Sequence, residues 1–378
     1  MSDFLNIGDF LEPVNIFELT NDEIYKDGQI GKTVNIYDEN FPDIEDADFV
    51  IIGCGEQRGS GFHKGLSDAP NVIRKYFYSL YLWHFDLKIA DIGNITHGSS
   101  LTDSYAGLRT VINELINANK TVVILGGSHD LALAQYYAHG DNKKAIEVSN
   151  IDALIDLNID SIYRNDNFLM EMLTGEPNFI RHYNHIAFQS FYVHPRMLET
   201  MDKLRFDCFR VGSVKESIDE MEPVIRNSQM LTFDISAIAN AYAPANHVSP
   251  NGLNGEDACM LFRYAGMSSN MNTIGIYNYH PELDKNELTA KQISQMLWYL
   301  LDGRSRGVKE ASMDEKELFN EYHLAFAEVE TMFIQSKKTG RWWMQLPDKR
   351  FIACSYKDYQ IASSNEIPER WIRAQERD

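Results

Sequence analysis

The feature that most constrains the fold is a repeated alternation of short apolar runs with segments of helical period. Between the runs, segments such as SYAGLRTVINELINAN and SIDEMEPVIRNSQ place apolar residues three and four positions apart. This alternation predicts an α/β fold, a three-layer α/β/α arrangement with a mainly parallel central sheet. The predicted strands are DFVIIG (48–53), TVVILGG (121–127), VSNID (148–152), HIAFQS (185–190), FDCFRVG (206–212), MLTFDI (230–235) and TIGIYN (273–278).

The alternation runs without a Pro/Gly/Ser linker to about residue 302. We therefore expect one α/β domain over 1–303, with an N-terminal extension at 1–47 and a C-terminal extension at 304–378 packed on the domain.

The C-terminal extension has a different character. DEKELFNEYHLAFAEVE (314–330) predicts an amphipathic helix, and MFIQSKKTGRWWMQL (332–346) predicts a β-hairpin that turns at KKTG. The arms of the hairpin carry Phe333, Trp342 and Trp343. These side chains either form a partner-binding surface or pack on the extension's own sheet.

Charge and composition limit the partners. The formal net charge of −20 disfavours nucleic acid and anionic membranes, whereas cationic ligands remain open. No apolar run reaches membrane-spanning length, and the first residues are acidic where a secretory signal needs basic ones. The four cysteines form no CxxC pair, which favours reduced thiols. We expect a cytoplasmic protein without membrane insertion.

Polar residues gather where three predicted strands end. GGSHD supplies His129 between Ser128 and Asp130, VSNIDALIDLN supplies Asp152 and Asp156, and LTFDIS supplies Asp234. The carboxyl ends of parallel strands are where ligands bind in open α/β sheets, so His129 is a candidate site residue. The alternative is that Ser128 and Asp130 cap the following helix.

Taken together, these motifs and GSGFHKGLSDAPNVIR (59–74) resemble the ureohydrolase superfamily of arginase, agmatinase and formimidoylglutamase, over residues 48 to 302. The resemblance implies an arginase-like fold. In that family the motifs GGDHS or GGGHE, DAHxD and SxDxD hold two manganese ions that share a hydroxide. Carried over by position, His129, Asp152, Asp156 and Asp234 stand where the family has the ligands of the more buried metal.

Three family positions are replaced. Leu154 stands for the histidine of DAHxD, Ser236 for the second aspartate of SxDxD, and Asn278 for a glutamate that contacts the guanidinium in arginase-like relatives. Leucine cannot coordinate a metal, and a hydroxyl is a poor ligand for a hard divalent cation. The resemblance therefore implies one divalent cation (Mn²⁺, Mg²⁺ or Zn²⁺) or none, and weaker activation of water.

The surviving carboxylates would repel one another. Two charges about 5 Å apart repel by roughly 3 kcal/mol at an effective dielectric of 20. A bound cation, a protonated carboxyl group, a nearby Lys or Arg, or a protonated His129 would each offset this repulsion.

Other motifs offer no alternative chemistry. There is no GxSxG elbow, no Cys-His signature and no GxGxxG fingerprint, and GCGEQRGSG (53–61) lacks the Lys-Ser/Thr of a P-loop. We expect that glycine-rich segment to be a loop near the strand ends. His247 and His280 stand alone in the sequence, and we expect both to be structural.

Two functions fit these observations. In the first, which we favour from sequence, the chain has lost its binuclear centre, has little or no activity, and binds a small-molecule or protein partner. In the second, it is a mononuclear metal-dependent hydrolase of C–N bonds in formimidoyl, amidine or guanidino substrates. Relatives commonly form trimers or hexamers, so the resemblance also allows a homo-oligomer.

Overall fold

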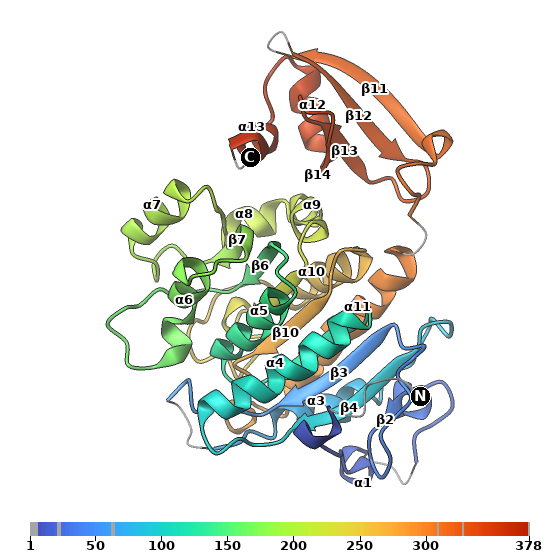
Figure 1. Cartoon of the computed structure of the whole chain (residues 1–378), viewed down its shortest axis with the longest axis vertical. Helices are drawn as coiled ribbons and strands as arrows, with labels where there is room; N and C mark the ends of the chain where they lie inside the picture. The colour runs from blue at the N-terminus through green and yellow to red at the C-terminus, as the bar shows by residue number, and fades with distance from the viewer. Residues whose placement is uncertain (1–6, 21–23, 62–64, 308–309, 327–328, 377–378) are drawn as a thin grey trace.

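The fold is built on a large, mostly parallel sheet (Figure 1). The computed structural model describes residues 7–20, 24–61, 65–307, 310–326 and 329–376. Strand β1 runs antiparallel to β4, and the other pairings within the large sheet are parallel. In spatial order the strands are β1 (Leu11–Glu12), β4 (Ile89–Ile95), β3 (Phe49–Cys54), β5 (Thr121–Gly126), β10 (Thr273–Tyr277), β9 (Met230–Asp234), β6 (Ile146–Ile151), β7 (Ile180–Phe188) and β8 (Asp207–Arg210), with β2 (Asn35–Ile36) also pairing β4.

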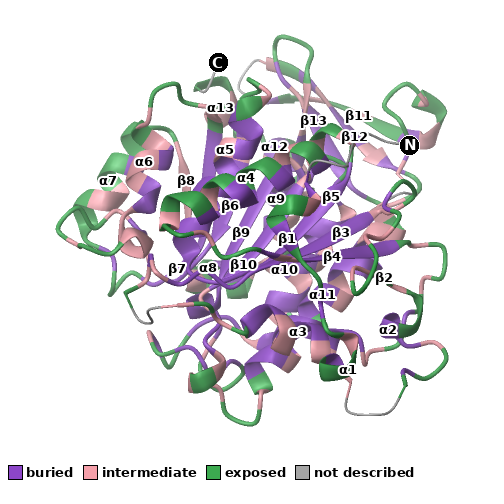
Figure 2. Ribbon diagram, turned by 60° about the horizontal axis from the view of Figure 1, so that its bottom comes forward, coloured by how far each residue is buried: buried purple, intermediate pink, exposed green. Residues whose placement is uncertain are grey.

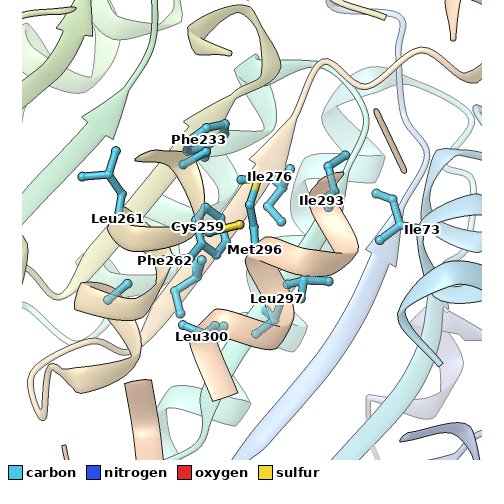
Figure 3. Packing of buried hydrophobic residues seen from close by; sticks show 14 of the residues in the cluster. Ile73, Phe233, Cys259, Leu261, Phe262, Ile276, Ile293, Met296, Leu297 and Leu300 are labelled. Carbon is cyan, nitrogen blue, oxygen red and sulfur yellow. The ribbon is translucent and has the colours of Figure 1, made fainter. Parts of the chain in front are cut away.

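Helices cover both faces of this sheet, as Figure 2 shows by the buried strands at its centre. Side chains alternate along β5, so Val123 and Leu125 join one hydrophobic core and Val122 and Ile124 join the other. The first core contains side chains of α3 (Ala69–Phe77), α10 (Gly255–Met267) and α11 (Leu288–Gly307), part of which Figure 3 shows; the second contains those of α4 (Leu101–Asn117) and α5 (Ala132–Asp141). The three-layer prediction is confirmed.

The remaining helices are short. They are α1 (Ile16–Leu19), α2 (Ile30–Thr33), α6 (Phe168–Thr174), α7 (Pro195–Lys203), α8 (Val211–Glu216), α9 (Met221–Arg226), α12 (Tyr356–Ser363) and α13 (Glu369–Glu376). Within the ranges that the structure describes, no helix combines the length and the apolar character needed to cross a bilayer.

The seven predicted strands are present, but the sequence did not predict β4. Polar residues interrupt its apolar pattern, and one of them, Asp91, accepts hydrogen bonds from the buried guanidinium of Arg74, with Nε–Oδ2 at 2.7 Å. Arg74 ends the stretch GSGFHKGLSDAPNVIR, whose last six residues lie in α3. Residues 62–64 of the loop before it lie outside the described residues.

The C-terminal extension forms a second, antiparallel sheet with two helices, α12 and α13. Its strands are β11 (Phe319–Phe326), β12 (Val329–Ser336), β13 (Trp342–Gln345) and β14 (Phe351–Cys354). The hairpin prediction is confirmed, since β12 pairs antiparallel with β13. The helix predicted over 314–330 is wrong: the segment contains β11 and the start of β12, whose pairing overrides the helical spacing of the apolar residues.

The aromatic side chains of the hairpin are buried. Phe333, Trp342 and Trp343 are each at most 8% exposed, so the packed alternative holds and these side chains do not form a docking surface. Trp343 lies under the guanidinium of Arg226 from α9, at 4.4 Å from the ring centroid. The Nη2 group of Arg226 donates to the carbonyl oxygens of Trp342 and Cys354, which ties the extension to the α/β body.

Candidate metal centre

Strand register brings the predicted site residues to one edge of the sheet. Strand β10 lies between β5 and β9, with Ile276 opposite Leu125 and Tyr277 opposite Asp234. Because β6 pairs with the other side of β9, Asp152 follows its strand at the same edge as Asp234.

A close backbone approach shapes the turn after β5. A Cβ at Gly127 would lie 2.0 Å from the carbonyl oxygen of Glu56, so only glycine fits there. The chain then enters a short 3₁₀ turn, His129–Leu131, for which no side chain caps the first residues. The capping alternative is therefore wrong, and Asp130 instead accepts a hydrogen bond from the hydroxyl of Tyr105.

The three candidate carboxylates gather around one ring nitrogen of His129. Nδ1 of His129 lies 3.2 Å from Oδ2 of Asp152, 3.3 Å from Oδ2 of Asp156 and 3.2 Å from Oδ2 of Asp234. Ligand atoms of His129, Asp152 and Asp234 all lie within 4.8 Å of one another, as a shared ion requires. Yet Nδ1 of His129 and the Oδ2 atoms of Asp152 and Asp156 are buried without a hydrogen-bond partner among the described residues.

Contacts and burial within the cluster shift the pKa values of its members. Burial works against a charged His129, but its contacts with the three carboxylates outweigh burial and raise its pKa well above the ordinary value. Burial, and then the charge of Asp152, raise the pKa of Asp156 well above its usual range. Burial also opposes the charge of Asp152, but the adjoining His129 holds the pKa of Asp152 below its usual range.

Two of the residues that the resemblance predicts to be replacements, Ser236 and Asn278, contact the same carboxylates. The hydroxyl of Ser236 donates to Oδ1 of Asp152 at 2.7 Å, and the side-chain amide of Asn278 donates to Oδ2 of Asp234. Asn278 also accepts from the backbone N–H of His129 at 3.2 Å and has a φ of 60°. Leu154 lines the pocket beside them.

The three carboxylates of the cluster, Asp152, Asp156 and Asp234, line a pocket of about 130 Å³. Both isolated histidines of the sequence, His247 and His280, line this pocket, and their ring centroids are 5.8 Å apart. Nδ1 of His280 lies 3.3 Å from the side-chain amide nitrogen of Gln57, in the glycine-rich segment. The first two residues of that segment end β3, and the rest is a loop at the strand ends, as predicted. Sequence reasoning missed this placement because neither histidine belongs to a motif, although each follows a predicted strand.

Comparison with known protein families gives one match that covers most of the chain. The model of the arginase family matches residues 47–302. Among curated proteins, the formimidoylglutamase of *Streptococcus gordonii* is 23% identical over 306 residues, which cover 74% of this chain and 92% of the relative. That of *Vibrio cholerae* is 24% identical over 284 residues, covering 68% and 83% respectively.

Solved structures show the same fold. The formimidoylglutamase of *Bacillus subtilis* superposes with a TM-score of 0.66 at 19% identity, covering 75% of this chain and 95% of that one. The formiminoglutamase of *Trypanosoma cruzi*, solved with Mn²⁺, has a TM-score of 0.63 at 18% identity and covers 70% and 95%.

Proposed function

The chain belongs to the arginase family, and from that premise we propose that it is a hydrolase of C–N bonds in formimidoyl or related amidine compounds, with one divalent cation at its centre. The relatives that support this proposal are formimidoylglutamases. None of the relatives described above is a binding or scaffold protein, so we now prefer the hydrolytic function to the one that the sequence alone favoured.

The single observation that carries the proposal is the convergence of unpartnered, buried ligand atoms. Ligands 2.0–2.2 Å from a common metal are roughly 3.0–3.5 Å apart, which matches the separations between Nδ1 of His129 and the three carboxylates. Buried polar atoms normally have partners, so their absence here supports an ion as the missing partner. The mixed nitrogen and oxygen donor set suits Mn²⁺ or Zn²⁺, and a structural neighbour was solved with Mn²⁺.

The neutral side chains at the replaced positions support one cation instead of two. Ser236 and Asn278 donate hydrogen bonds to Asp152 and Asp234, and so occupy carboxylate lone pairs that a second cation would need. The side chain of Leu154 offers no ligand atom beside them.

A bound cation would lower the pKa of a water molecule and so supply hydroxide near neutral pH. In the reaction, the water oxygen bonds to the carbon of the C=N group, the bond from that carbon to the carrier nitrogen breaks, and a water proton passes to that nitrogen. A formimidoyl compound thus yields an amine and formamide. Ser236 and Asn278 keep Asp152 and Asp234 oriented, and the buried pocket limits the access of bulk water.

Metal analysis and turnover test the proposal together. We expect the chain, purified without chelator, to contain about one divalent cation and to release formamide from a formimidoyl substrate. Asp152→Ala and Asp234→Ala should each remove the cation and lower turnover to below about one hundredth, because each deletes a ligand.

Asp348→Ala is the matched control, since that aspartate is exposed and pairs only with Arg350 in the ion pairs described. The control should keep both cation and turnover. Two cations per chain, or undiminished turnover in Asp152→Ala, would contradict the proposal.

We also propose that the protein works in a reducing compartment such as the cytoplasm. The support is that Cys54, Cys208, Cys259 and Cys354 are free thiols.

A further inference from the structure

Exposed apolar side chains gather on the segments at the edge of the sheet where the pocket lies. They come from the segments that follow three neighbouring strands, β6, β7 and β9. Large apolar side chains this exposed are informative when they gather at a site. We call this group the apolar rim; it comprises Ile159, Ile162, Tyr163, Phe191, Tyr192 and Tyr242.

Contacts place two sides of the rim next to the pocket. The hydroxyl of Tyr192 donates to the carbonyl oxygen of Val248, a pocket-lining residue, and the ring of Phe191 packs edge-on against Tyr192 at 4.7 Å. On another side, the ring of Tyr163 covers Gly61, where an added Cβ would lie 1.9 Å from it. Gly61 adjoins Ser60 in the lining, so Tyr163 borders the pocket as well.

Tight local structure holds Tyr163 in place. Gly61 has a φ of +66°, which favours glycine, and the backbone N–H of Asn165 donates to the carbonyl oxygen of Gly59. The segment after β6 is thereby tied to the segment after β3. The rim is thus attached to the pocket walls.

The pocket itself is small. Its volume of about 130 Å³ lies below the roughly 300–1,000 Å³ of sites that enclose a whole drug-sized ligand, so it suits an amidine group of a few heavy atoms. The rest of a substrate must lie outside, against the rim. In addition, the lining residues within the described ranges include four aspartates and neither lysine nor arginine, so a carboxylate on the substrate would meet mainly negative charge there.

We infer that the substrate carries its formimidoyl or amidine group on an uncharged alkyl or aryl group, and not on an acidic carrier such as glutamate. This inference rests on the hydrolytic function proposed above. The apolar rim buries the carrier, while the acidic pocket takes the small nitrogenous head. Phe191 and Ile162, which are 68% and 89% exposed, each have much apolar surface that a carrier can bury.

Two matched substrates test this inference. We expect kcat/KM for N-formimidoyl-phenethylamine to exceed that for N-formimidoyl-glutamate by about tenfold or more, mainly through a lower KM. In the double variant Phe191→Ser/Ile162→Ser this ratio should fall by about tenfold. Because both side chains are exposed, the variant should fold normally.

Trp83→Ser is the control, since Trp83 is equally exposed, at 72%, but precedes β4 at the opposite edge of the sheet. It should leave both rates unchanged. Equal rates for the two substrates, or preference for the glutamyl compound, would overturn the inference.

A binding measurement separates failure of the inference from failure of the proposed function. Phenethylamine, the product amine, should bind to the unchanged chain more tightly than glutamate by calorimetry, and the double variant should lose that preference. Absence of turnover with this preference intact would refute the hydrolase and keep the rim as an apolar binding site; absence of the preference would refute the inference.

Discussion

At the level of residues, the motifs predicted which side chains meet. His129, Asp152, Asp156 and Asp234 were expected together and do lie together. Asp234 ends its strand and the other three lie in the short segments that follow β5 and β6, so strand register leaves them little freedom. His247 and His280 could not be placed, since their positions depend on loops that the periodicity of the sequence does not describe.

Restoring the family residues at positions 154, 236 and 278 should let the chain bind a second cation. The triple variant Leu154→His, Ser236→Asp, Asn278→Glu should raise the cation content from about one to about two per chain, because it adds an imidazole and two carboxylates to the pocket wall. Metal analysis of the purified variant measures this directly.

The φ of 60° at Asn278 disfavours glutamate by about 1–2 kcal/mol, so the double variant Leu154→His/Ser236→Asp is the control that avoids this strain. A cation content that stays at one in both variants would show that the family positions alone do not define the second site.

His139 gives a prediction of pH dependence away from the site. It lies in α5, its Nε2 is 3.0 Å from the hydroxyl of Thr273, and burial lowers its pKa from 6.5 to about 4. Between pH 4 and pH 6.5 the imidazole of His139 is therefore protonated in the unfolded chain and neutral in the folded chain. This contribution to stability is therefore full above pH 6.5 and is lost as pH falls towards 4.

We expect His139→Gln, which keeps a group able to bond Thr273, to flatten the loss of stability between pH 6.5 and 4 by up to about 3 kcal/mol. Chemical denaturation of both proteins at several pH values measures the difference. Parallel curves for the two proteins would contradict the lowered pKa.

At the level of elements, the sequence was most informative where strands are buried on both faces. Continuous apolar runs predicted β3, β5, β9 and β10, whereas β4 was missed because Asp91 interrupts it. Over 314–330 the apolar spacing suited a helix, and only the pairing of β11 with β12 decides for a strand. Such long-range pairing cannot be read from local spacing.

The buried side chain of Arg226 connects helix α9 to strand β13, and removing it should destabilise the fold. Arg226 is 5% exposed, pairs with Glu222 at 2.9 Å and stacks over Trp343. Arg226→Ala should lower the free energy of unfolding by about 3–5 kcal/mol, since it breaks a buried ion pair and two bonds to backbone carbonyls.

Lys88→Ala, which breaks the exposed pair with Asp46, is the control and should cost at most about 1 kcal/mol. Equal destabilisation of the two variants in urea would show that Arg226 does not hold the extension.

At the level of the whole molecule, we propose that residues 1–303 and 304–378 are separate building blocks that unfold together. The family match ends at residue 302, yet Arg226 and Arg341 contact both parts, the latter by donating to the carbonyl oxygen of Met267. We expect circular dichroism and tryptophan fluorescence to report a single, coincident urea transition. Two separated transitions would show that the extension is only loosely attached.

The four converging side chains follow three strands that are distant in sequence and meet only when β5, β10, β9 and β6 have assembled. An unfolded chain therefore has no comparable set of ligands. An ion bound by the four side chains stabilises the native state by an amount that grows with the logarithm of the free ion concentration. The cell's supply of that ion would then govern the lifetime of the protein against proteolysis, in addition to its rate of turnover.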